Sequence, residues 1–185
     1  MKGKKFLAGL LAGLSVVLGS WGLVACGGTD SSSSSTSSPS ESSSVAAQPK
    51  GVLYQVIDGE AVVTGYDGED ESVTIEATYE GVAVTKIAND AFNSNETLTE
   101  IVIPDSVTVI GASAFTMCLG LTSVTIGAGV TTIDDSAFAY CSNLSSITFN
   151  GTKKQWKAID KTSDWTFVPA TKVVCSDGEA DLLAK

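Results

Sequence analysis

Hydrophobic and polar residues divide the chain into three stretches of different character. Residues 6–25 are almost entirely apolar, residues 27–50 are dominated by serine, and from residue 51 onward apolar residues recur at short regular intervals. A serine tract is typical of an unfolded linker, whereas alternation of apolar and polar residues predicts half-buried β-strands. We therefore expect a folded domain only within residues 51–185.

The third stretch contains a repeat of 23 residues. When residues 84–106, 107–129 and 130–152 are aligned, six positions are identical in all three copies and two more stay apolar. A unit this short cannot bury its apolar face alone, so we predict that the copies stack into a solenoid. The identical positions are Val84/Val107/Val130, Thr85/Thr108/Thr131, Ile87/Ile110/Ile133, Ala91/Ala114/Ala137, Phe92/Phe115/Phe138 and Leu98/Leu121/Leu144, and the apolar ones are Ile101/Val124/Ile147 and Ile103/Ile126/Phe149.

Each copy predicts the same local elements. Residues 121–126 (LTSVTI) alternate and predict a short strand, and residues 129–133 (GVTTI) predict a second one. Residues 134–140 (DDSAFAY) begin with Asp134, a residue type that often caps helices, and predict a short helical turn. The expected fold is an α+β solenoid with short parallel strands about 4.8 Å apart and interior ladders of Phe, Leu and Ile.

The repeat, written VTxIGxxAFxxCxxLTSVTI, resembles the BspA-like leucine-rich repeats of bacterial cell-surface proteins over about residues 75–151. The flanking segments are similar to the N- and C-terminal caps of that family. We therefore divide the domain into an N-terminal β cap (residues 51–83), three leucine-rich repeats (84–152) and a C-terminal cap (153–185). The resemblance implies adhesion to host matrix proteins or to other bacteria.

Residues 1–25 have the features of a secretory signal peptide. Three lysines precede the apolar run, which ends in small residues and Cys26 rather than in a basic residue. The residues LVAC (23–26) resemble the lipobox of bacterial lipoproteins. By that resemblance the chain is cut before Cys26, and Cys26 carries a thioether-linked diacylglycerol. The alternative is a signal anchor with an incidental cysteine, because 20 apolar residues are also long enough for a spanning helix.

Residues 26–50 are then expected to be a flexible tether, because a Ser-rich segment buries too little surface to offset the entropy lost on ordering. As a coil, such a tether would average about 25–30 Å from end to end. The expected partner of this region is the lipid bilayer, contacted through acylated Cys26. The expected location is the surface of a bacterial cell membrane, to which the exported chain stays anchored.

The formal charge of the chain is −10, and the sequence contains no histidine. Loss of the three signal lysines would make the exported form more acidic still. Nucleic acid is not an expected partner, because phosphate contacts need clustered basic residues. Without histidine, neither a Ser-His-Asp nor a Cys-His catalytic arrangement can form within this chain. We expect a non-enzymatic monomer without a cofactor; the alternative is a cell-envelope hydrolase accessory or weak glycosidase that uses carboxylates such as Asp134 and Asp135.

Three further features each have a structural and a functional interpretation. Cys118 and Cys141 lie one repeat apart, within reach of a disulfide, but parallel side chains in a ladder favour two free buried thiols. Trp156 and Trp165 could form a ligand platform, but the end of a solenoid must be covered, which favours packing in the cap. The acidic run at residues 67–71 (DGEDE) lacks the spacing of a calcium loop, which favours a solvated turn.

The strands that end the repeats supply the candidate ligand site. If the apolar ladder positions of these strands point inward, the alternate residues must point outward on one face of a sheet. Such a face is flat, rich in hydroxyl groups and able to offer many weak hydrogen bonds to an extracellular protein or glycan. The alternative is that threonine occupies these positions for its β-propensity alone. The candidate contacts are Ser123, Thr125, Ser146 and Thr148, and no catalytic or metal site is predicted.

Overall fold

The structure is a computed structural model that describes residues 50–162 and 164–183. These residues belong to one compact unit, Val45–Lys185. The expected signal peptide, Cys26 and nearly all of the expected tether lie outside the described residues. Within the described residues, no helix is long and apolar enough to cross a membrane.

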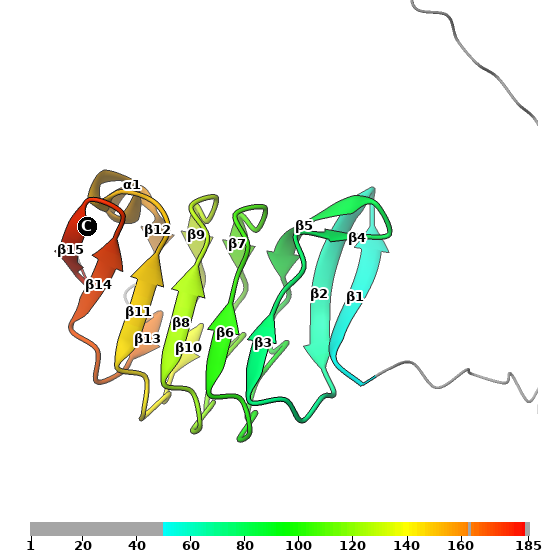
Figure 1. Ribbon diagram of the computed structural model, residues 1–185, viewed down its shortest axis with the longest axis horizontal. Coiled ribbons are helices and arrows are strands. Elements are labelled where there is room, and N and C mark those ends of the chain that lie inside the picture. Colours follow the sequence, from blue (N-terminus) through cyan, green and yellow to red (C-terminus); the bar gives the residue numbers. More distant parts are fainter. Residues whose placement is uncertain (1–49, 163, 184–185) are drawn as a thin grey trace, which may run out of the picture. The chain divides into compact units, whose positions relative to one another are not determined.

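Two β-sheets and a column of turns surround one hydrophobic core (Figure 1). The six-stranded sheet consists, in spatial order, of β15 (Gly178–Asp181), β14 (Lys172–Cys175), β11 (Ser146–Phe149), β8 (Ser123–Ile126), β6 (Glu100–Val102) and β3 (Ser72–Thr74). The seven-stranded sheet consists of β1 (Val52–Ile57), β2 (Glu60–Tyr66), β5 (Val82–Ile87), β7 (Val109–Ile110), β9 (Thr132–Ile133) and β12 (Asp160–Lys161), with β4 (Thr78–Tyr79) paired to β5. A small third sheet pairs β10 (Phe138–Ala139) with β13 (Thr166–Phe167).

The predicted stack of repeats is confirmed by the strand register. In the six-stranded sheet, β3, β6, β8, β11 and β14 are parallel, and equivalent residues lie directly beside one another. Ile101 pairs with Val124, which pairs with Ile147, so each copy of the repeat forms one rung. Because β3 and β14 belong to this sheet as well, both capping segments contribute a strand to the stack.

Turns without helical geometry occupy the segments for which we expected short helical turns. Each repeat places two residues in the left-handed region, four positions apart, and a left-handed residue interrupts an α-helix. The turns are present, but their helical character is not confirmed, because a left-handed backbone is not evident from serine, methionine or tyrosine in a sequence. Among the described residues the one α-helix is α1 (Lys153–Ala158), which begins with a capping box at Thr152. The left-handed residues and their φ angles are Asp90 (57°), Ser113 (55°) and Ser136 (57°), then Ser94 (58°), Met117 (59°) and Tyr140 (59°).

Backbone hydrogen bonds join these turns from one rung to the next. The amide of Phe92 donates to the carbonyl of Ala114 at 2.8 Å, and the amide of Phe115 donates to Ala137 at 2.8 Å. Within a rung the chain closes a turn, as in the bond from the Thr116 amide to the Ser113 carbonyl at 3.1 Å. The turns therefore form a third hydrogen-bonded column beside the two sheets.

Phenylalanine side chains form a continuous stack through the core. The ring centroids of Phe92 and Phe115 are 4.9 Å apart and those of Phe115 and Phe138 are 5.0 Å apart, with nearly parallel planes. Tyr66 covers the first ring of the stack at 5.5 Å, and Trp165 covers the last edge-on at 6.1 Å. The leucine and isoleucine positions that are identical in the three copies are also fully buried, as the interior ladders predict.

One threonine position is identical in all three copies, and its hydroxyl forms a hydrogen bond to the backbone of the neighbouring rung. The hydroxyl of Thr108 donates to the carbonyl of Thr85 at 3.1 Å, and that of Thr131 donates to the carbonyl of Thr108 at 3.2 Å. A second column runs through Thr122, whose hydroxyl donates to the carbonyl of Thr99 at 3.0 Å. Each bond spans one repeat, so these side chains fix the register as the backbone does.

Both tryptophans of the C-terminal segment are buried, which confirms packing in the cap. Trp156 lies 5.5 Å from Phe149 and 5.9 Å from Trp165, measured between ring centroids. The ammonium group of Lys161 lies 4.6 Å from the centre of the Trp156 ring and donates to the Trp156 carbonyl. These groups cover the last rung, where the apolar core would otherwise face water.

Replacing Phe115 with alanine should destabilise the domain by about 3–5 kcal/mol, because it opens a cavity in a stack with rings on both sides. The measurement is chemical denaturation of a fragment that spans residues 45–185, with Phe167→Ala as the control because Phe167 is exposed. Equal stabilities for the two variants would contradict the buried phenylalanine stack.

Replacing Met117 with glycine should stabilise the domain by about 0.5–1 kcal/mol. Relief of the left-handed backbone gives about 1–2 kcal/mol, and the greater flexibility of glycine in the unfolded chain takes back about 0.5–1 kcal/mol. Leu119→Gly is the matched control, since Leu119 is similarly exposed but is not among the residues with positive φ. The control should lower the melting temperature; a loss of stability in Met117→Gly as well would show that the side chain makes contacts that stabilise the fold.

Candidate functional site

The six-stranded sheet presents the predicted outward face. Along β8 and β11 buried residues alternate with partly or fully exposed ones, so Ser123, Thr125, Ser146 and Thr148 all lie on the solvent side. Ser146 is directly beside Ser123, and Thr148 is directly beside Thr125. The structure therefore brings together all four candidate residues, in two rows that run across the strands.

Both rows continue onto the neighbouring strands. The serine row extends to Glu100 on β6 and Ser72 on β3, and the threonine row extends to Val102 and Thr74. Equivalent positions on adjacent strands are about 4.7–4.9 Å apart, so the hydroxyl groups repeat at that interval. Because five parallel strands form this face, it is larger than the face that we expected from three repeats.

Charged residues lie at the margins of this face. At one margin, the hydroxyl of Ser72 donates to the carboxylate of Glu100 at 3.5 Å. At the other, the ammonium group of Lys172 donates to Glu179 at 2.9 Å, and this contact raises the pKa of Lys172. A ligand that covers the four central hydroxyl groups would therefore displace water from neutral side chains, and it would leave Glu100 on one side and the Lys172–Glu179 ion pair on the other.

The column of turns carries an exposed apolar stripe that the sequence analysis missed. Met117 is 49 % exposed and Tyr140 is 60 % exposed, and the exposed ring of Phe167 stacks on Tyr140 at 6.2 Å. Met117 and Tyr140 are one repeat apart, at the position immediately before Cys118 and Cys141. That spacing was a signal in the sequence, but only the left-handed backbone turns these side chains outward.

A depression of about 450 Å³ adjoins this stripe at Phe167. It is lined mainly by apolar side chains from β13, the segment after it and the residues that follow β15. The hydroxyl of Thr166 lies at this depression, buried and without a hydrogen-bond partner among the described residues. The depression is a concave surface, unlike the sheet face, where an apolar group with a polar atom would fit.

Cys118 and Cys141 are free buried thiols, as predicted, and so is Cys175. The thiol of Cys118 donates to the carbonyl of Phe92 at 3.1 Å, and that of Cys141 donates to the carbonyl of Phe115 at 3.0 Å. The neighbouring Cys118 thiol and burial together raise the pKa of Cys141 above its ordinary value. Such a thiol stays protonated, so it serves packing rather than nucleophilic chemistry.

The acidic run at residues 67–71 is held by local contacts. The carboxylate of Asp67 accepts the amide of Gly51 at 2.7 Å, and the carboxylate of Glu69 accepts the ammonium group of Lys50 at 2.9 Å. The hydrogen bond from Lys50 lowers the pKa of Glu69. These contacts give two of the acids a structural role, because they tie the loop between β2 and β3 to the residues just before β1.

The carboxylates that were considered for catalysis lie in the column of turns. The backbone of Asp134 donates to the carbonyl of Ile110, and the carbonyl of Asp135 accepts from Ser113. In the described part of the chain, no group of three or more acidic or cysteine side chains converges in a way that could hold a metal ion.

Comparison with known protein families matches residues 71–166 to the BspA type leucine rich repeat region (6 copies), over slightly more than half of the chain. A solved leucine-rich repeat protein from Bacteroides capillosus is 27% identical with a TM-score of 0.58, over 70% of this chain and 96% of that one. A leucine-rich repeat protein of T. pallidum is 25% identical with a TM-score of 0.51, over 54% of this chain and 51% of that one, so the chain spans about half its length. A comparison with curated protein sequences finds no match.

Proteins with BspA-like repeats are typically exposed at the bacterial surface and typically lack enzymatic activity. The matched span starts just before β3 and ends in β13, so it covers the rungs of the solenoid together with the turns that join them. The interval of 23 residues, the parallel rungs and this match together show that the chain belongs to the BspA-type leucine-rich repeat family.

Proposed function

We propose that this protein is a surface-exposed binding and adhesion module that recognises a protein or glycan ligand through the outer face of its six-stranded sheet. The observation that carries the proposal is the in-register array of Ser123, Thr125, Ser146 and Thr148. The family supports a surface or protein-binding role at a coarser level.

The chemistry of this face suits many weak contacts. A hydroxyl group can donate and accept hydrogen bonds, and it loses less hydration free energy on burial than a charged group does. A glycan hydroxyl or the backbone of an extended peptide could therefore replace the water on several rungs at once. Because single contacts of this kind are weak, affinity would rise with the number of rungs that the ligand spans.

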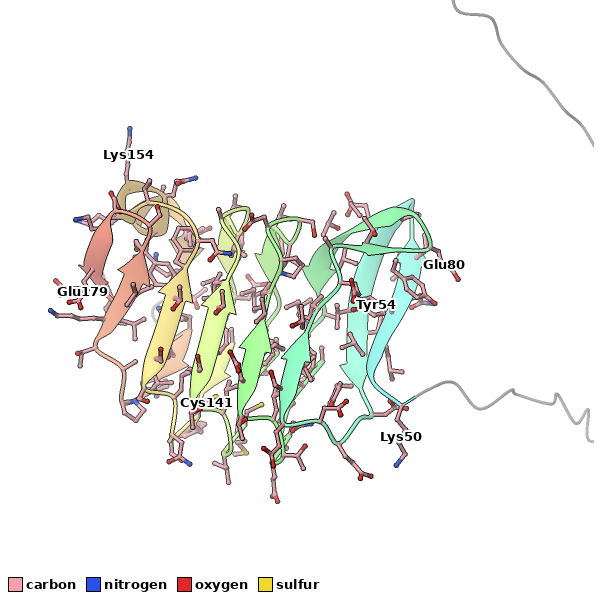
Figure 2. All side chains as sticks on the ribbon, viewed as in Figure 1. Lys50, Tyr54, Glu80, Cys141, Lys154 and Glu179 are labelled. Carbon is pink, nitrogen blue, oxygen red and sulfur yellow. The ribbon has the colours of Figure 1, made fainter. Side chains whose placement is uncertain are left out.

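The proposed attachment to the membrane rests on Cys26 and the residues before it. Acylation of Cys26 would place two hydrocarbon chains in the bilayer, and each buried methylene contributes about 0.8 kcal/mol. The folded domain would then be held near the outer surface by residues 26–50. Lys50 lies just before β1, so the tether would enter the solenoid at its N-terminal end (Figure 2).

The alternative of a hydrolase accessory or weak glycosidase gains no specific support. A glycosidase needs two carboxyl groups that face one another across a substrate cleft. Asp134 and Asp135 instead follow one another in a turn that is bonded to the preceding rung. We therefore retain binding, without catalysis, as the proposed function.

Replacing Thr125 and Thr148 together with lysine should weaken ligand attachment at least tenfold and change the melting temperature little, because both side chains face solvent. The measurement is binding of the fragment spanning residues 45–185 to an immobilised panel of matrix proteins and cell-wall glycans. The control is Ser142→Lys with Ser145→Lys, two exposed positions outside the strands. A double variant that folds and binds every panel member as the wild type does would move the site off this sheet.

Replacing Cys26 with alanine should abolish lipidation, because the thioether needs the cysteine sulfur. Metabolic labelling with a palmitate analogue should mark the wild-type chain and leave the variant unmarked. Cys175→Ala serves as the control, since Cys175 is buried in the folded domain. Equal labelling of the Cys26→Ala variant would contradict the lipoprotein assignment.

A further inference from the structure

The outer face of the seven-stranded sheet contains a depression of about 510 Å³. It lies over β2 and β5, near the hairpin at the N-terminal end of the sheet (Figure 1). Five polar and three apolar residues line it. Sites for small molecules typically enclose about 300–1,000 Å³ and combine apolar walls with a few polar groups, so this depression has the size and the lining of a ligand site.

An irregularity in the strand pairing shapes this depression. Ala61 on β2 lies beside Val84 on β5, but the next residue, Val62, lies beside Lys86, so β5 contains one extra residue, Thr85. Such a bulge changes the direction in which side chains point and is common next to functional sites. Val62 lines the depression and is only 9 % exposed, so it forms an apolar floor.

Two of the polar side chains are held in place by the protein and keep atoms for a ligand. The side-chain oxygen of Asn89 accepts the amide of Ala112 at 3.1 Å, and one carboxylate oxygen of Glu60 accepts the Thr85 hydroxyl at 3.0 Å. Gly111 leaves room for this arrangement, because a Cβ atom there would lie 2.6 Å from the Asn89 oxygen. The NH₂ group of Asn89 and the second oxygen of Glu60 have no partner among the described residues, so they are oriented in advance for a ligand.

Acidic and basic groups share the depression without pairing. Asp58 belongs to the tight turn between β1 and β2, where both Asp58 (φ 52°) and Gly59 (φ 84°) have the positive φ that such turns require. Lys86 lines the same depression as Asp58 and Glu60, yet in the part of the chain that the structure describes its ammonium group forms no ion pair. The depression therefore offers hydrogen-bond acceptors and donors around an apolar floor.

We propose that this depression binds a neutral sugar unit of a glycan. A sugar hydroxyl donates a hydrogen bond to a carboxylate and accepts one from an ammonium or amide group, so a single class of ligand satisfies groups of both kinds. The C–H groups of the sugar ring would pack on Val62 and Ala88. An anionic ligand would meet Asp58 and Glu60, and a cationic ligand would meet Lys86.

The shape of the depression favours a small ligand over a protein surface. A stable protein–protein interface buries about 800 Å² on each partner and is usually broad, whereas this depression is local and concave. The site lies on a different sheet from the hydroxyl array of Ser123, Thr125, Ser146 and Thr148. It therefore does not depend on the function proposed for that array.

NMR titration of the isotope-labelled fragment spanning residues 45–185 tests the site. The probes are maltose, cellobiose, lactose and N,N′-diacetylchitobiose, which differ in the arrangement of their hydroxyl groups. We expect at least one of them to shift the amide signals of Val62, Lys86 and Asn89 in a saturable manner, with a dissociation constant in the millimolar range, because each contact with an exposed polar group is weak.

Matched variants separate a ligand contact from a structural role. Asn89→Asp keeps the oxygen that bonds Ala112 but loses the NH₂ donor, and it should weaken binding of that disaccharide at least fivefold. Asn150→Asp makes the same chemical change at an exposed position after β11 and should bind as the wild type does. Glu60→Gln should also weaken binding, whereas Glu80→Gln, exposed and outside the depression, should not.

Three results would overturn the proposal. The first is that no disaccharide gives saturable shifts, or that the shifts are confined to the six-stranded sheet. The second is that Asn89→Asp, shown to be folded by its circular dichroism spectrum, binds as tightly as the wild type. The third is that free lysine, a zwitterion, binds the depression more tightly than every disaccharide, which would assign it to a charged ligand.

Discussion

The constraint on which the structure depends is that every rung must lie directly over the next. Three sets of hydrogen bonds span the same interval: the parallel strands, the threonine hydroxyls and the turns. The stacked rings of Phe92, Phe115 and Phe138 add a core that is periodic in the same way. One inserted residue would disturb all of these at once, which explains why the repeat keeps 23 residues across its three copies. Stability in such a stack is shared between neighbours, so the central rung carries more of it than the ends.

The same register creates the surfaces that can bind. Because equivalent residues lie side by side, a substitution repeated in each copy becomes a row on the surface. Serine and threonine repeat on β8 and β11 and form a neutral array, whereas Met117 and Tyr140 repeat in the turns and form an apolar stripe. A sheet face of this kind can be extended by adding rungs without redesign of the core. The small number of rungs therefore limits the area of the binding surface and not its chemistry.

Much of this architecture was predictable because it follows from periodicity. The spacing of Phe115 and Leu121 identified the core, the alternation in residues 121–126 identified the outward rows, and the need to cover an open end identified the role of Trp156. The turns were not predictable, because Met117 and Tyr140 adopt a left-handed backbone that their residue types disfavour. Bonds to the next rung accompany this conformation, as where the amide of Met117 donates to the carbonyl of Ala139, 22 positions away. The backbone preference of a residue type does not reveal such a constraint. The exposure of the apolar stripe follows from the left-handed backbone that the constraint produces.

The two ends of the solenoid solve the problem of termination differently. At the C-terminal end, α1 brings Trp156 over the last rung, and the neighbouring edge strand β15 carries Glu179 and Asp181. At the N-terminal end, the hairpin of β1 and β2 covers the first rung of the core but leaves its own edge open. A hairpin alone cannot end a sheet, because it replaces one edge with another of the same kind. Charged residues could have protected that edge, as they do at β15, yet β1 carries apolar side chains and polar Gln55 instead. The sequence of β1 is therefore better suited to a strand that has a partner than to one that faces water.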